Sequence, residues 1–162
     1  MIDVMNISKA LVIPAPQQLT GVSTSAIASG DFVSDAQTVF EGFDKQAHVE
    51  IVGVRLWEAA TAQKKDLRLW IFNTVIASTI NSNDAAAISA AEALTLIGTI
   101  DIEDTEYVNT ASTEAAVVKM LTVPLAAYLL TGNIYAFITA RESITYTTAT
   151  PLKFTLIVRQ HE

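Results

Sequence analysis

Apolar residues in much of this chain recur at every second position, which is the period of a β-strand. The alternation is clearest in residues 133–141 and 152–159. The apolar residues expected to share one face of their strand are Ile134, Ala136, Ile138 and Ala140 in the first stretch and Leu152, Phe154, Leu156 and Val158 in the second. This pattern indicates a mainly β protein.

Residues 48–74 contain two further apolar runs of strand length, separated by a polar segment that includes Lys64 and Lys65. Both tryptophans of the chain, Trp57 and Trp70, fall in these runs, and each can bury roughly 200 Å² of surface. The polar segment has the character of a hairpin loop. We therefore predict that the two runs pair as the central hairpin of a β-sandwich.

One short helix is expected within residues 85–94, because Ser89 and Glu92 have the spacing of a capping box. Strands are predicted at residues 96–102 and 115–122, and Pro124 is expected to end the second strand or to place it at a sheet edge. About seven or eight strands with one helix predict an antiparallel, jelly-roll-like β-sandwich.

Residues 1–30 differ in composition from the remainder of the chain. They contain Pro14, Pro16 and a polar run over residues 17–25, and the two prolines favour an extended backbone. The segment is interpreted either as a first edge strand followed by a loop or as an arm that lies on a neighbouring subunit. The predicted organisation is an extended N-terminal arm or edge segment, 1–30, and one β-sandwich domain, 31–162. Deletion of the arm is then expected to leave a folded sandwich.

The composition narrows the class of protein. A hydrophobic content of 51% excludes a disordered tail, and 10 basic against 17 acidic residues argue against binding to nucleic acid. The absence of cysteine excludes disulfides and thiol chemistry. The apolar residues 117–130 are interrupted by Lys119 and Pro124 and are too short to span a bilayer. Since the N-terminus lacks the features of a signal peptide, we expect synthesis in a cytoplasm and no membrane partner.

Candidate catalytic residues are sparse. His48 and His161 have no partner at metal-ligand spacing, and His161 is expected to be frayed at the chain end. The sequence contains neither the serine elbow of hydrolases nor a glycine-rich phosphate loop. Glu50 and Glu58 are a conceivable carboxylate pair for a glycosidase, but the sequence does not fix their separation. We therefore predict no catalytic and no cofactor-binding residues, and that the protein is not an enzyme.

Four carboxylates gather at the end of the strand predicted at residues 96–102. Oxygen ligands at alternate strand positions suit a hard cation such as calcium, although the EF-hand pattern is absent. The residues are Asp101, Glu103, Asp104 and Glu106. A solvated strand end explains them better, so no metal site is predicted.

A second binding hypothesis rests on aromatic side chains. Exposed aromatics on one face of a sandwich form a stacking platform for sugars, whereas aromatics in strands more often belong to the core. The candidates for such a platform are Trp57, Trp70, Tyr135 and Tyr146. The alternative function under this hypothesis is that of a carbohydrate-binding β-sandwich module.

Residues 48–160 contain, in order, two apolar arms, an Asn-Asp stretch with an Ala-rich helix, an acidic strand end and two final strands around a Thr-Tyr-Thr segment. The corresponding sequences are VGVRLWE, LRLWIF, NSNDAAAISAAEAL, GTIDIEDTEYV and IYAFITARESITYTTATPLKFTLIV. This order of features resembles a family of small bacteriophage virion proteins known as capsid cement or decoration proteins. Residues 1–30 have no clear counterpart.

The resemblance implies a mechanical function. Such a protein binds the outer surface of an assembled head and bridges neighbouring subunits of the major capsid protein, which stabilises the shell. Its expected partners are the major capsid protein and further copies of itself, as a homodimer or homotrimer. Its expected location is the outer capsid surface of the virion, after synthesis in the host cytoplasm. The resemblance would place the alternative function, the carbohydrate-binding module, on the virion surface or tail.

Overall fold

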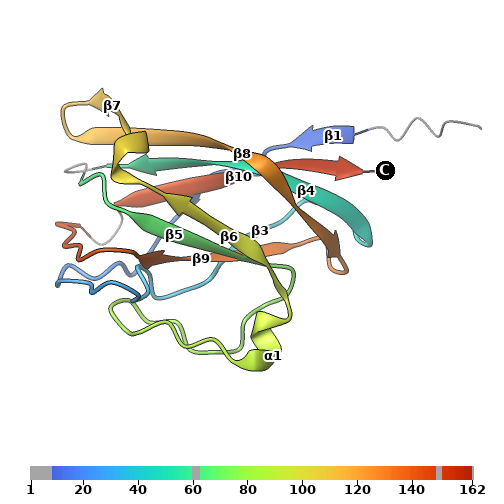
Figure 1. Cartoon of the computed structure of the whole chain (residues 1–162), viewed down its shortest axis with the longest axis horizontal. Helices are drawn as coiled ribbons and strands as arrows, with labels where there is room; N and C mark the ends of the chain where they lie inside the picture. The colour runs from blue at the N-terminus through green and yellow to red at the C-terminus, as the bar shows by residue number, and fades with distance from the viewer. Residues whose placement is uncertain (1–8, 60–62, 149–150, 162) are drawn as a thin grey trace, which may run out of the picture.

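The computed structural model describes residues 9–59, 63–148 and 151–161. Two antiparallel sheets pack face to face as a sandwich, so the predicted mainly β class is confirmed (Figure 1). The elements in chain order are β1 Lys9–Val12, β2 Gln17–Gln18, β3 Thr38–Phe40, β4 Ala47–Glu58, β5 Leu67–Phe72, α1 Ala90–Ala93, β6 Leu96–Ile102, the 3₁₀ turn η1 Asp104–Glu106, β7 Val108–Ala111, β8 Glu114–Leu129, β9 Ile134–Ala140 and β10 Leu152–His161.

The strand order is that of a jelly roll. The larger sheet has the order β1-β10-β4-β8-β7, with β2 also paired to β10, and the smaller sheet has the order β3-β9-β5-β6. The first strands thus pair with the last, and the pairs β3–β9, β4–β8 and β5–β6 nest inside them. Nested antiparallel pairs of this kind arise when one long hairpin is rolled into two sheets. The jelly-roll-like prediction is confirmed at this level.

The predicted central hairpin is wrong. β4 pairs with β10 and β8 in the larger sheet, whereas β5 pairs with β6 and β9 in the smaller sheet. The polar segment between them therefore crosses from one sheet to the other; residues 60–62 of it lie outside the described part. A connection between two sheets is polar for the same reason as a hairpin loop, since both are exposed to solvent. The polarity of the segment therefore does not distinguish a hairpin from a crossing between sheets.

The described part of the predicted arm, residues 9–30, belongs to the sandwich. β1 and β2 extend the larger sheet at the edge of β10, which agrees with the edge-strand interpretation. Leu19, Val22 and Ile27 are buried in the main core, with 2%, 3% and 0% of their surface exposed. Residue 30 is therefore not a structural boundary. Residues 1–8 of the predicted arm lie outside the described residues.

Two apolar clusters stabilise the fold. The main core lies between the sheets and includes the inward faces of β9 and β10, as the alternation predicts. A second cluster covers the outer face of the smaller sheet, where residues 73–95 fold back over it; its buried members are Phe32, Phe72, Ile76, Ile80 and Phe137. β9 is thus buried on both faces.

The helix in this covering segment is shorter than predicted and spans four residues. Its capping box is present: Ser89 Oγ accepts from Glu92 N, and the Glu92 carboxylate accepts from Ser89 N at 2.9 Å. The same carboxylate accepts from Ser78 N at 2.7 Å, which ties the helix to the preceding loop. Hydrogen bonds from Ser78 and then Ser89 lower the pKa of Glu92 to about 2.

β8 continues through Pro124, contrary to the predicted end at residue 122. Its register against β4 changes between the pairs Met120–Gly53 and Leu125–Ile51, so that four residues of β8 oppose Val52 alone. Pro124 falls in this bulge, where a missing N–H removes no ladder hydrogen bond. Within the described residues, the helices are too short to cross a bilayer.

Candidate interaction surface

Six of the ten large apolar side chains that are exposed among the described residues lie along β8 and its flanks. The first half of β8 is apolar on both faces: Ala115 and Val117 point into the core, while Val118 and Met120 point outward and are 64% and 57% exposed. A solvated face of an antiparallel sheet is normally polar. We call the following residues the β8 surface: Val108, Val118, Met120, Val123, Tyr128 and Leu130.

The register places the centre of this surface on the outer face of the larger sheet. Met120 lies beside Gly53, and Gly53 lies beside Ile157 of β10. A Cβ atom on Gly53 would be 3.0 Å from Met120 Sδ and 3.3 Å from Ile157 Cδ1. The two side chains therefore close over the glycine backbone. The result is a continuous apolar strip across three strands.

The polar side chains around this strip are less acidic than the whole protein. Arg55, Lys153 and Arg159 lie on the same outer face as Glu50 and Glu114, which makes three basic against two acidic residues. The whole chain has 10 basic and 17 acidic residues. This face consequently lacks the self-repulsion of the acidic remainder and suits close approach to another protein.

One end of the outer face is hollowed into an open pocket of about 730 Å³. His48 and Tyr128 line it with their ring centres 4.9 Å apart. The prediction that His161 is frayed at the chain end is wrong, because His161 lies in β10 opposite His48. Its Nε2 atom is 3.5 Å from Glu50 Oε1, and Arg159 is also within ion-pair distance of Glu50.

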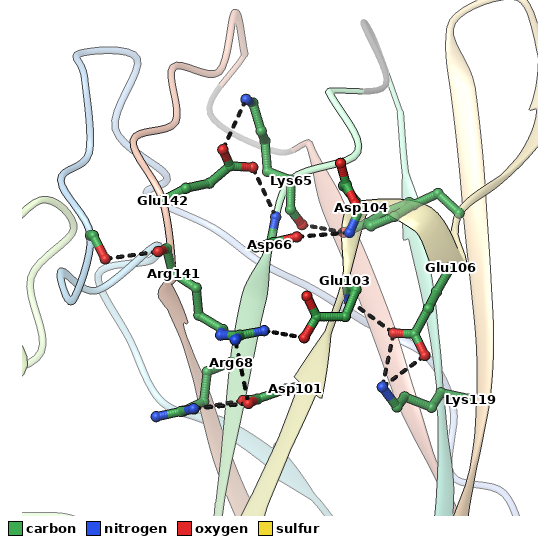
Figure 2. Close-up of polar contacts among 12 residues, drawn as sticks. Lys65, Asp66, Arg68, Asp101, Glu103, Asp104, Glu106, Lys119, Arg141 and Glu142 are labelled. Atoms are coloured by element: carbon green, nitrogen blue, oxygen red, sulfur yellow. Dashed lines mark hydrogen bonds and ion pairs between the residues drawn. The ribbon is translucent and has the colours of Figure 1, made fainter.

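The acidic group at the end of β6 forms ion pairs with basic side chains (Figure 2). Asp101 accepts from Arg68 Nε at 2.6 Å and from Arg68 Nη2 at 2.8 Å. Arg141 binds Glu103 and lies 3.8 Å from Asp101. The hydrogen bond from Arg68 lowers the pKa of Asp101.

Glu106 of that group also pairs with a basic side chain, whereas Asp104 is held through its backbone. Lys119 of β8 pairs with Glu106 at 2.7 Å, and the Asp104 backbone N–H donates to Asp66. The ion pairs connect β5 with β6 and β8 with η1, and Arg141, the residue after β9, joins the end of β6 (Figure 2). Among the described residues, no three histidine, aspartate or glutamate side chains are placed to hold a metal ion.

The four candidate aromatic residues do not form one platform. Trp57 lies on the outer face of the larger sheet, whereas Trp70 and Tyr135 lie on the outer face of the smaller one. Tyr146 is buried in the main core. Trp70 is only partly buried; it stacks on Phe137 with 5.9 Å between ring centres. The aromatic side chains are therefore divided among three environments.

Glu50 and Glu58 do not form a glycosidase pair. They lie eight residues apart on one strand, which corresponds to roughly 25 Å at the rise of a β-strand, far beyond the separation of catalytic carboxylates. Glu50 is on the outer face, and the bulge at Val52 turns Glu58 to the inner face. Glu58 is 1% exposed and accepts from Lys64 N at 2.8 Å.

Burial raises the pKa of the Glu58 carboxyl above its usual value of 4.5. Its Oε1 atom and the Tyr146 hydroxyl are both buried and have no hydrogen-bond partner among the described residues. Burial, and then the negative charge of Glu58, also raises the pKa of Tyr146. An ionised Glu58 is therefore an unfavourable charge inside the end of the sandwich.

Glu58→Gln is expected to make the protein more stable at neutral pH. Because the folded-state pKa is raised, the carboxyl favours folding fully only below about 4.5, and this contribution is lost as the pH rises through the folded pKa. Urea unfolding at pH 4 and at pH 7.5 gives the unfolding midpoints of Glu58→Gln and of the wild type. The midpoint of Glu58→Gln should exceed that of the wild type at pH 7.5 and approach it at pH 4. If the midpoint of Glu58→Gln were instead below that of the wild type by the same amount at both pH values, the charge of Glu58 would not be the cause.

The residues of the β8 surface were missed by sequence reasoning. The signal was present, because residues 115–121 are apolar at both odd and even positions apart from Lys119, which exceeds what one buried face requires. From the sequence, that stretch is interpreted as a strand and tested as a membrane span, but it is not considered as a binding surface. Comparison with known protein families and with curated proteins finds no significant match for this chain.

Proposed function

We propose that this protein is a bacteriophage capsid cement, or decoration, protein. It binds the outer surface of the assembled head and bridges neighbouring subunits of the major capsid protein. The observation that carries the proposal is the β8 surface, because large apolar side chains exposed together on a folded domain mark a protein-binding site. The motif resemblance over residues 48–160 supplies the identity of the partner.

The length of β8 suits a bridging function. β8 runs beside all twelve residues of β4, which extend roughly 40 Å at the usual rise per residue. Val108 lies beside one end of this strand and Leu130 follows the other. A contact distributed along that length crosses the boundary between two shell subunits, whereas a compact patch contacts one. Jelly rolls occur in capsid and lectin domains alike, so the fold by itself does not choose a function.

Stabilisation of the shell follows from binding linkage. A protein that binds the assembled lattice but not free subunits stabilises the lattice by RT ln(1 + [L]/Kd), about 2.7 kcal/mol at a hundredfold excess over Kd. A homodimer or homotrimer gains further through the effective concentration of its second site. This mechanism requires no catalytic residue, cofactor or metal. Synthesis in the host cytoplasm and residence on the virion surface complete the proposal.

The direct test is binding to purified heads that lack this protein. We expect wild-type protein to saturate the heads and to raise the temperature at which they release DNA. The double variant Val118→Glu/Met120→Glu should bind at least tenfold more weakly, which is about 1.4 kcal/mol, since it buries two charges in the contact. Co-sedimentation over a concentration series measures the affinity.

The matched control is Val75→Glu/Leu94→Glu. These residues are 64% and 89% exposed, but they lie in the segment that covers the smaller sheet. The control should bind as the wild type does. Equal weakening by both double variants would show that added charge, and not the β8 surface, is responsible. Failure of the wild type to bind any head preparation would contradict the proposed function.

A further inference from the structure

The outer face of the smaller sheet is hollowed on both sides of Trp70. One pocket, of about 410 Å³, is polar and is lined in part by Ser29, Arg68, Thr139 and Arg141. A second, of about 240 Å³, is apolar and is lined by Phe72, Ile88 and Leu96 among others. Trp70 and Ala86 line both pockets and therefore separate them. The two hollows lie where the covering segment, residues 73–95, meets the sheet.

Trp70 is held in a fixed orientation between them. Its indole N–H donates to Thr139 Oγ1 at 3.0 Å, and Thr139 is 4% exposed. Its ring is stacked on Phe137 with an interplanar angle of 22°. Phe137 in turn contacts Phe72 and Phe32 in the second cluster. A partly exposed indole with both its N–H and one ring face already engaged is preorganised for a ligand.

The polar pocket has donors but no net charge. Arg68 and Arg141 are each paired with carboxylates, Asp101 and Glu103, so two positive and two negative charges cancel (Figure 2). The two hydrogen bonds from Arg68 to Asp101 use two of the five N–H groups of a guanidinium. The Arg68 and Arg141 side chains remain 38% and 29% exposed.

This combination selects among ligand classes. A phosphate is not favoured because the carboxylates cancel the positive charge, and a metal cation is not favoured because the arginines already occupy the carboxylates. A neutral ligand with several hydroxyl groups and one apolar face fits, since it uses guanidinium N–H groups and an indole together. We propose that the pockets beside Trp70 bind a neutral pyranose ring of a saccharide. This inference is independent of the proposed capsid function, because it uses the opposite sheet from the β8 surface.

Fluorescence of Trp70 reports such binding directly. The chain has two tryptophans, so Trp57→Phe, on the larger sheet, leaves Trp70 as the only indole. This protein is titrated with the methyl pyranosides of glucose, galactose, mannose and N-acetylglucosamine, to roughly 100 mM to detect millimolar affinity. Dextran and a neutral galactan distinguish a polysaccharide from a free sugar. Sodium phosphate is the anionic control.

We expect a saturable change in emission with at least one sugar and no saturable change with phosphate. Ala86→Leu, which fills space shared by both pockets without changing a polar group, should weaken binding at least tenfold. Trp70→Phe should do the same when binding is followed by saturation-transfer NMR of the sugar. Saturation by phosphate, no response to any sugar, or unchanged binding by both variants would each overturn the proposal. Any of these results would leave the capsid test unaffected.

Discussion

Deletion of residues 1–30 is expected to abolish folding. The deletion removes Leu19, Val22 and Ile27 from the main core, and burial of each such side chain contributes about 1.5–3 kcal/mol. Their sum, about 5–9 kcal/mol, is comparable with the whole stability of an ordinary domain. The deletion also removes both backbone hydrogen bonds between Ile27 and Ile144 and exposes the edge of β10. The composition of residues 1–30 predicts the opposite, that this truncated protein remains folded.

Far-UV circular dichroism and urea unfolding distinguish the outcomes. The matched control is deletion of residues 1–8, which leaves every described strand and core residue in place. The control should unfold cooperatively and close to the wild-type midpoint, whereas the longer deletion should show no cooperative transition. A cooperative transition in the longer deletion would mean that residues 9–30 are dispensable and that the arm interpretation was correct.

Phe137→Ala is expected to lower the free energy of unfolding by about 3–5 kcal/mol, because it opens a cavity at a fully buried aromatic. Phe137 contacts Phe32 edge-to-face at 5.0 Å and Phe72 at 5.5 Å between ring centres. It also stacks on Trp70. Loss of this ring therefore weakens the attachment of the whole covering segment, residues 73–95. Urea unfolding followed by circular dichroism gives the difference.

Trp70→Ala is the informative comparison for this variant. The sequence predicts about 3–5 kcal/mol for Trp70→Ala if the residue is core. Because Trp70 is only partly buried, we expect Phe137→Ala to be the more damaging change. A larger loss for Trp70→Ala would show that the second cluster depends on the indole and its hydrogen bond to Thr139, not on the phenylalanine rings.

The alternation of apolar residues predicted which face of a strand is buried, but not which strand it joins. Ile134 and Ile138 of β9 face the main core as expected. β4 and β5, however, pair with strands more than twenty residues away in sequence instead of with each other. A period of two specifies a side-chain direction and contains no information about the partner strand. In a jelly roll the partners are fixed by nested long-range pairing.

Short sequence motifs predicted those features whose interacting groups lie close together in the sequence. The capping box of Ser89 and Glu92 formed as predicted because its four hydrogen-bonding groups lie within one turn. The end of β8 was misplaced because a proline is tolerated in a bulge, and the bulge depends on β4 opposite. The candidate binding surfaces likewise depend on strands that are distant in the sequence. Val118 and Met120, and the pockets beside Trp70, became recognisable only when neighbouring strands fixed their faces.

Quantitative mass spectrometry of phage particles purified from the source organism tests the proposed cement function most directly. The measurement is the ratio of this chain to the major capsid protein, after washing that removes loosely bound protein. A protein that bridges subunits over the whole lattice should be present at a copy number comparable to that of the shell protein. A few copies per particle, or none, would contradict the proposed function.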